Sequence, residues 1–150
     1  MKYMTREIII NATPEEVWAV LVDLDSYPEW NPYIVKAVGT ATEGGRLAVT
    51  LSPPGSRGTT LKPTVTELRS GEVLEWWGHV GFRGILDGRH RFEVHPDDGG
   101  TRLTQSETFT GVLVPFVARN LDRGTAAGFT VMNEALKARV EQRHAFDDLG

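Results

Sequence analysis

Apolar and polar residues alternate along most of the chain, with glycine and proline between the alternating runs. Alternation with a period of two is typical of strands that have one buried face. Glycine-rich turns such as Glu43–Gly45 and Asp97–Gly100 separate consecutive runs, which favours an antiparallel meander. The predicted strands are residues 4–11, 33–40, 46–51, 59–68, 73–80, 85–95 and 101–111.

Two short helices are predicted directly after the first strand. Thr13 can cap a helix whose first position is Pro14, and Glu16 stands three residues after the cap, which completes a capping box. Trp18 lies on the apolar stripe of this helix, where we expect it to be buried. The next stretch, residues 26–32, contains two prolines and is expected to form a short helical turn and a corner.

A long helix is predicted over about residues 115–143, because apolar residues recur there with helical spacing. The order of strand, two helices, six strands and long helix gives an α+β fold class. We expect a seven-stranded antiparallel sheet that curves around the C-terminal helix. Space left between that sheet and the helix would form a pocket.

The last two predicted strands place polar side chains inside the protein. In residues 85–95 the set containing Asp87, Arg89 and Arg91 is entirely polar, so the alternate set, which includes His90, must face the interior. By the same argument Gln105 and Glu107 face inward from the following strand. If the two strands pair through the turn at residues 97–100, His90 lies directly opposite Glu107.

His90 and Glu107 are therefore the candidate catalytic residues, as a general acid and base. The pair can also anchor a carbonyl or hydroxyl group of a ligand. A third interpretation is purely structural: the two groups satisfy one another and fix the register of the strands. A buried polar group without a partner costs roughly 1–3 kcal/mol, which favours some role beyond packing.

Apolar side chains predicted to face inward complete the candidate ligand-binding site. The strands supply Leu47, Val49, Leu51, Leu61, Val65 and Leu74, and the predicted ligand-binding residues are Trp30, Trp76, Phe92, Gln105, Phe109, Gly124, Gly128 and Met132. Gly124 and Gly128 leave either space for a ligand over the helix or room for close packing of the sheet. Phe116, Phe129 and Met132 are expected to add adaptable apolar walls.

Composition narrows the function classes. The chain of 150 residues is the size of one domain, so residues 1–150 are predicted to form a single domain. Its net charge of −4, with scattered basic residues, disfavours a nucleic-acid partner. Its apolar runs are too short to cross a bilayer and no secretory signal is visible, so we predict a cytoplasmic protein without membrane insertion.

The sequence lacks the residue patterns and motifs that metal sites and several classes of enzyme usually require. There is no cysteine, and the four histidines show no metal-ligand spacing, so we expect no metal site. Phosphate loops, nucleophile elbows and zinc-protease motifs are also missing from the sequence, and we expect no cofactor.

Six stretches of the chain resemble one known superfamily, and they occur in its order: residues 8–18, 24–32, 86–93, 99–104, 109–111 and 132–137. The sequence is similar to the START/Bet v 1-like superfamily, and more closely to its bacterial polyketide cyclase/dehydrase-like branch (SRPBCC). This resemblance implies the helix-grip fold that the pattern of residues also predicts. It does not fix a function, because members of the superfamily include lipid and hormone carriers as well as aromatase/cyclases.

Three functions remain open at this point. The first is a carrier or sensor that binds a small hydrophobic or aromatic molecule between sheet and helix. The second is a polyketide cyclase/dehydratase-like enzyme that uses His90 and Glu107. The third is a protein-interaction module, like the co-chaperone relatives. An apolar cavity favours the first, an open polar cavity the second, and a filled interior the third.

Overall fold

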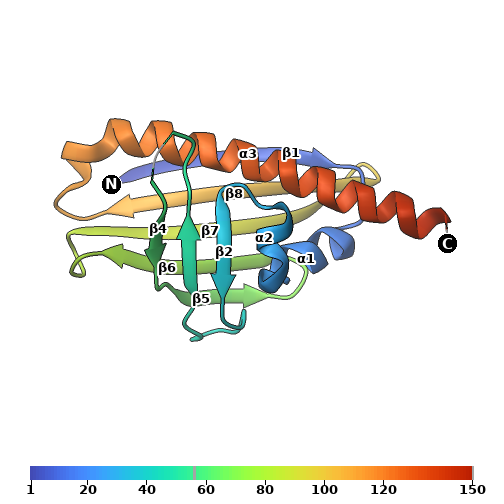
Figure 1. Cartoon of the computed structure of the whole chain (residues 1–150), viewed down its shortest axis with the longest axis horizontal. Coiled ribbons are helices and arrows are strands. Elements are labelled where there is room, and N and C mark those ends of the chain that lie inside the picture. The colour runs from blue at the N-terminus through green and yellow to red at the C-terminus, as the bar shows by residue number, and fades with distance from the viewer. Residues whose placement is uncertain (56, 150) are drawn as a thin grey trace.

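The computed structural model describes residues 1–55 and 57–149 (Figure 1). Within them the chain forms α1 (Pro14–Val22), a 3₁₀ turn η1 (Leu24–Ser26), α2 (Tyr27–Trp30) and the long helix α3 (Val114–Leu149). The strands are β1 (Lys2–Ile10), β2 (Ile34–Val38), β3 (Ala48–Leu51), β4 (Thr59–Leu61), β5 (Thr64–Arg69), β6 (Val73–Val80), β7 (Leu86–Asp97) and β8 (Gly100–Thr110). The α+β class and the antiparallel sheet with a long C-terminal helix are confirmed.

The described strands number eight and form two sheets, so the prediction of one seven-stranded sheet is wrong. A five-stranded sheet has the order β1-β8-β7-β6-β5, and a three-stranded sheet has the order β2-β3-β4. The predicted strand 59–68 is divided at Lys62 and Pro63 into β4 and β5. Proline has no N–H to donate to a ladder, and the chain turns a corner there. Backbone bonds from Leu47 N to Pro63 O (2.9 Å) and from Val65 N to Gly45 O (2.8 Å) join the two sheets at this corner.

The register of β7 and β8 is the one predicted from alternation. His90 pairs with Glu107, and Phe92 pairs with Gln105. His90, Phe92 and Gln105 are all buried. The two longest strands of the sheet therefore bring a histidine, a carboxyl group and an amide to its inner face.

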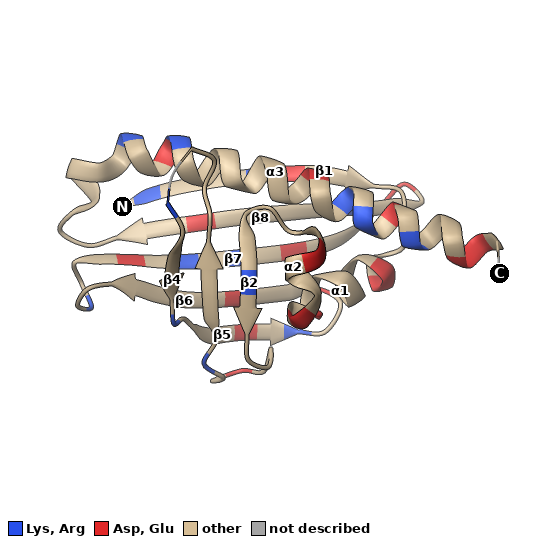
Figure 2. Ribbon diagram, viewed as in Figure 1, with Lys and Arg blue, Asp and Glu red and all other residues tan. Residues whose placement is uncertain are grey.

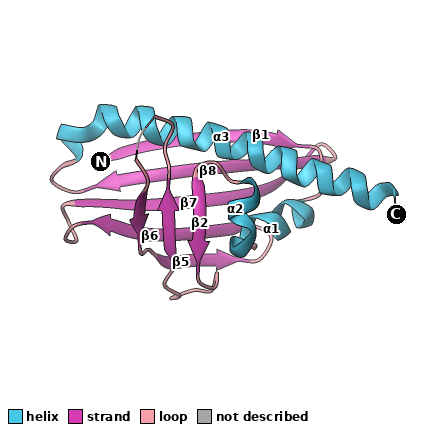
Figure 3. Ribbon diagram, in the orientation of Figure 1, coloured by secondary structure: helices cyan, strands magenta, loops and turns pink. Residues whose placement is uncertain are grey.

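The helices begin as the sequence indicates, and α3 is longer than expected. The capping box is present: Thr13 Oγ1 accepts from Glu16 N, and Glu16 Oε1 accepts from Thr13 N. Figure 3 shows α3 running along β1 and β8 for the length of the sheet. Its buried face includes Phe129, Met132, Leu136 and Val140. Trp18 is only partly buried, and Phe116 is 82% exposed rather than part of an inner wall.

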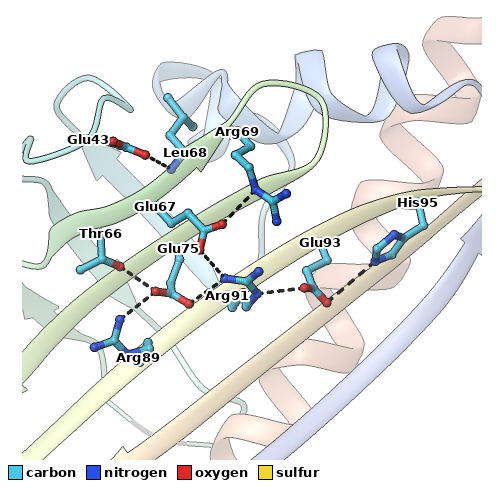
Figure 4. A network of polar contacts seen from close by, with 10 residues as sticks. All are labelled: Glu43, Thr66, Glu67, Leu68, Arg69, Glu75, Arg89, Arg91, Glu93 and His95. Atoms are coloured by element: carbon cyan, nitrogen blue, oxygen red, sulfur yellow. Dashed lines mark hydrogen bonds and ion pairs between the residues drawn. The ribbon is translucent and has the colours of Figure 1, made fainter.

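The outer face of the large sheet carries a network of ion pairs (Figure 4). Glu75 is 7% exposed and accepts hydrogen bonds from Thr66, Arg89 and Arg91 at 2.8–3.0 Å. Arg91 also reaches Glu67 at 3.0 Å and Glu93 at 2.9 Å. This polar face explains why the apolar side chains of the same strands point to the other side, toward α3 and the small sheet.

Candidate functional site

A cavity of about 210 Å³ lies between the two sheets and α3. Its walls come from β3 and β4 on one side, from β6, β7 and β8 on the other, and from the first half of α3. The apolar lining residues are Val49, Leu51, Pro53, Leu61, Pro63, Trp76, Val80, Leu86, Phe109 and Leu121. Such a cavity, largely apolar with a few polar groups, is the usual form of a small-molecule site.

His90 and Glu107 both line this cavity, as the alternation predicts. His90 Nδ1 lies 3.5 Å from Glu107 Oε2, and Glu107 Oε2 has no hydrogen-bond partner among the described residues. The side chain of Glu107 keeps 14% of its surface accessible, on the side of the cavity. Part of the Glu107 side chain therefore reaches the cavity, while its Oε2 is buried beside His90 Nδ1 without a hydrogen bond to any described residue.

A chain of hydrogen bonds fixes the protonation of the His90 ring. Gln105 Nε2 donates to Asn133 Oδ1 at 2.6 Å, so Gln105 presents its carbonyl oxygen to His90. His90 Nε2 lies 3.0 Å from that oxygen and must donate to it, because a carbonyl oxygen only accepts. In the neutral ring the proton is then on Nε2, and the lone pair of Nδ1 faces Glu107.

Burial keeps both groups of the pair uncharged near neutral pH. The His90 ring stacks on Phe92 (4.5 Å between centroids) and lies close to Trp76 and Phe129. Burial in this aromatic surrounding lowers the pKa of His90 to about 4, against a smaller opposite effect of the Gln105 hydrogen bond. Burial also raises the pKa of Glu107 to about 8. Glu107 is thus a carboxylic acid able to donate its proton, with a pKa in the range that acid–base catalysis uses.

Tyr33 and Thr125 also line the cavity, and neither was predicted as a site residue from the sequence. Tyr33 is 3% exposed and packs edge-on against Phe129. Burial, together with the nearby Glu107, raises the pKa of Tyr33. The signal for Tyr33 was its place directly after Pro32 at the start of a predicted strand. Thr125, between two helical glycines, gave no comparable signal.

The predicted ligand-binding residues divide into two groups. Trp76 and Phe109 line the cavity, together with His90 and Glu107. The other predicted residues do not line it: Trp30, Phe92, Gln105, Gly124, Gly128 and Met132.

Phe92, Gln105 and Met132 are fully buried in the core behind the cavity wall. Trp30 packs edge-on against Tyr27, 5.1 Å between centroids, and its indole N–H has no hydrogen-bond partner in the described part of the chain.

The two glycines of α3 do not leave space for a ligand. A Cβ atom at Gly128 would lie 2.3 Å from Cδ1 of the Tyr33 ring. The Tyr33 ring therefore fills the space beside Gly128. A Cβ at Gly124 would meet Pro53 Cβ at 3.6 Å, an ordinary contact. Of the two interpretations of these glycines, close packing describes Gly128, and the ring that fills its space is itself part of the cavity wall.

Two features are absent from residues 1–55 and 57–149, a metal-binding cluster and a membrane-spanning helix. No group of three or more His, Cys, Asp or Glu side chains there is placed to hold a metal ion. None of the helices in these residues has the length and apolar character needed to cross a membrane.

Comparison with protein families gives one match, which covers nearly the whole chain. The family is described as polyketide cyclase / dehydrase and lipid transport, and it matches residues 1–141. No curated protein matches the chain.

Solved structures with the same fold are numerous, and all those considered are distant in sequence. A START superfamily protein from Mycobacterium smegmatis has a TM-score of 0.74 and 19% identity, over 93% of this chain and 97% of its own. Ara h 8.0201 has a TM-score of 0.64 and 17% identity, over 94% and 98%. The di-domain ARO/CYC StfQ from the steffimycin biosynthetic pathway has a TM-score of 0.77 and 15% identity, over 95% of this chain and 52% of its own. At these identities the likeness shows a shared fold.

Proposed function

The chain belongs to the polyketide cyclase/dehydrase and lipid transport family, and from this premise we propose that it binds a small, mainly apolar molecule in the cavity between its sheets and α3. The role would be that of a carrier or sensor. The observation that carries the proposal is the cavity itself, since a filled interior was the expected mark of a protein-interaction module.

The size of the cavity limits the ligand. An engineered apolar cavity of about 150 Å³ holds benzene. A cavity of about 210 Å³ is therefore suited to a molecule of one or two rings. Trp76 and Phe109 supply aromatic surface for such rings.

The polar groups in the cavity favour a ligand with one hydroxyl or carbonyl group. Glu107 Oε2 is buried without a hydrogen-bond partner among the described residues, and Nδ1 of His90 presents a lone pair beside it. A ligand hydroxyl can accept a hydrogen bond from the protonated Glu107 carboxyl group and donate one to His90 Nδ1. A ligand charge placed against the apolar walls is disfavoured, because it would lose its hydration there.

Acid–base catalysis by the same pair is the second candidate. Glu107 has its pKa raised to about 8 by burial, and it faces the cavity beside a second titratable group. Such a carboxyl group can move a proton to or from a bound carbonyl compound, as a cyclase or dehydratase requires. The likeness to an ARO/CYC protein is compatible with this chemistry.

Binding is tested with 2-naphthol as the probe and saturation-transfer NMR as the measurement. Leu86 lines the cavity and is half-buried, so Leu86→Trp fills the space. The matched control is Leu68→Trp, since Leu68 is also half-buried on the sheet but lies outside the cavity. We expect wild type and Leu68→Trp to bind, and Leu86→Trp to lose about tenfold or more in affinity. Absence of binding to wild type, or equal binding by the two tryptophan variants, would refute the proposed site.

A further inference from the structure

Four exposed apolar side chains gather at one end of the molecule. Phe82 is 80% exposed, Val112 68%, Leu113 40% and Phe116 82%. Phe82 lies in the loop between β6 and β7, and the others lie between β8 and the first turn of α3. Figure 1 shows both connections at the same end of the sheet. We call these four residues the apolar tip.

Backbone hydrogen bonds hold the two connections of the apolar tip together. Val112 N donates to Gly84 O at 3.1 Å, and Leu113 N donates to Ile85 O at 3.0 Å. Phe116 N in turn donates to Leu113 O at 2.9 Å. The four side chains therefore form one surface, although two separate segments supply them.

This end of the molecule is basic, whereas the whole chain carries a net charge of −4. Arg83, Arg119 and Arg123 are exposed there. Figure 2 shows blue segments in the loop before β7 and in the first turns of α3. On α3 the two arginines follow Phe116 by three and seven residues, which places all three on one face. The guanidinium carbon of Arg83 lies over the Trp77 ring, 5.1 Å from its centroid.

The acidic residues close to the apolar tip are already paired. Asp122 forms an ion pair with Lys2 at 2.8 Å. Asp87 is buried and accepts from Gly84 N at 2.9 Å. In the described part of the chain, neither Arg119 nor Arg123 has an ion pair. Exposed apolar groups beside unneutralised arginines complement a surface that is apolar underneath and anionic on top.

The cavity opens beside the apolar tip. Val80 is 48% exposed and also lines the cavity, and it is two residues from Phe82. Leu86 and Leu121 also line the cavity and follow the two connections in sequence. A surface that covers the apolar tip would therefore lie next to the cavity entrance.

We propose that the apolar tip docks peripherally on an anionic phospholipid bilayer, with Phe82 and Phe116 in the interfacial region and the three arginines at the headgroups. A protein partner is less well matched, because a specific protein interface needs about 800 Å² on each side and some 20–30 residues. Four side chains are enough for a bilayer, which requires no matching shape. The docking itself is independent of the proposed function; only the exchange of a ligand between bilayer and cavity rests on it.

The experiment is flotation of the intact chain with vesicles of phosphatidylcholine alone and with 30% phosphatidylglycerol. Wild type is expected to float with the anionic vesicles and to be released as salt rises. Phe82→Ser/Phe116→Ser is expected to reduce partitioning by about tenfold or more. Phe146→Ser is the matched control, because Phe146 is equally exposed (76%) but lies near the other end of α3.

The arginines are tested separately. Arg119→Gln/Arg123→Gln should weaken binding to anionic vesicles, whereas Arg143→Gln, exposed near the opposite end of the helix, should leave it unchanged. Leu86→Trp should still float, so a failure of the ligand site is distinguishable from a failure of docking. The proposal is overturned if wild type floats with neither vesicle, if Phe82→Ser/Phe116→Ser floats like Phe146→Ser, or if the apolar tip proves to pair two copies of the chain or to bind a protein instead.

Discussion

Gly128→Ala is expected to destabilise the protein although it improves the helix propensity of α3. Alanine is favoured over glycine inside a helix by up to about 1 kcal/mol. At Gly128, however, the new Cβ would lie 2.3 Å from two atoms of the Tyr33 ring. That ring is 3% exposed and packs against Phe129, so it cannot swing into solvent. Overpacking of this kind costs about 1–3 kcal/mol.

Gly124→Ala is the control within the same helix. Its Cβ meets only Pro53 Cβ, at 3.6 Å, so the gain in helix propensity is expected without a steric cost. Because the propensity gain is common to both variants, their difference isolates the overpacking. We expect Gly124→Ala to be more stable than Gly128→Ala by about 1–3 kcal/mol.

Urea unfolding followed by far-UV circular dichroism measures both variants against wild type, with unchanged m-values as the check on comparable unfolding. The double variant Tyr33→Leu/Gly128→Ala removes the clashing ring, so it should be less destabilised than the sum of its single changes. Equal stability of Gly128→Ala and Gly124→Ala would show that the Tyr33 ring does not rest on Gly128, and the description of the cavity wall would be wrong.

Two further changes test the charges. Glu107 ionises at about pH 8 when folded and at its ordinary pKa of 4.5 when unfolded, so its contribution to stability is present below pH 4.5 and is lost as pH rises toward 8. Unfolded His90 is still half protonated at pH 6.5, so wild type is compared with Glu107→Gln, which shares the His90 contribution. Relative to this variant, wild type should lose about 1.6 kcal/mol of stability between pH 6.5 and 8 in denaturant titrations, and parallel pH profiles would contradict the assignment. On the outer face, Glu75→Ala removes the shared acceptor of Thr66, Arg89 and Arg91 and should cost about 1–2 kcal/mol in the same assay. Glu7→Ala, whose exposed carboxylate lies 3.9 Å from Arg102, should change stability by about 0.5 kcal/mol or less, and equal effects of the two substitutions would show that the network contributes nothing.

The polar pair of the site was predictable because the factors that place it are local. Alternation in β7 and β8 decides which side chains face inward, and the turn between the strands decides which residues lie opposite one another. Both rules act within about twenty residues of sequence. His90 opposite Glu107 follows from them without knowledge of the rest of the fold.

The division into two sheets was signalled in the sequence and was missed. Pro63 lies inside the run of residues that was predicted as one strand, and a proline in such a run argues against a continuous ladder. Given its proper weight, this signal would have predicted a break between β4 and β5.

The role of Gly128 could not be predicted from its own sequence context. A helical glycine leaves room, and whether a ligand or a side chain uses it depends on a residue far away in the chain, here Tyr33. Phe116 is different, because its exposure could have been predicted. It lies on the same helical face as the exposed Arg119 and Arg123, opposite the face that carries Met132 and Leu136.

The corner at Pro63 affects how easily the small sheet can open locally from the large sheet. The three-stranded sheet is joined to the five-stranded sheet by a short set of backbone bonds around Gly45, Leu47 and Val65, whereas β7 and β8 share eleven paired positions. Separate cooperative units of a protein open with different free energies, and the unit held by fewer hydrogen bonds and contacts opens first. We therefore expect the cavity wall formed by β3 and β4 to open more readily than the wall formed by β6, β7 and β8. Opening of the small sheet would admit a molecule wider than the closed entrance while the strands that carry His90 and Glu107 stay paired.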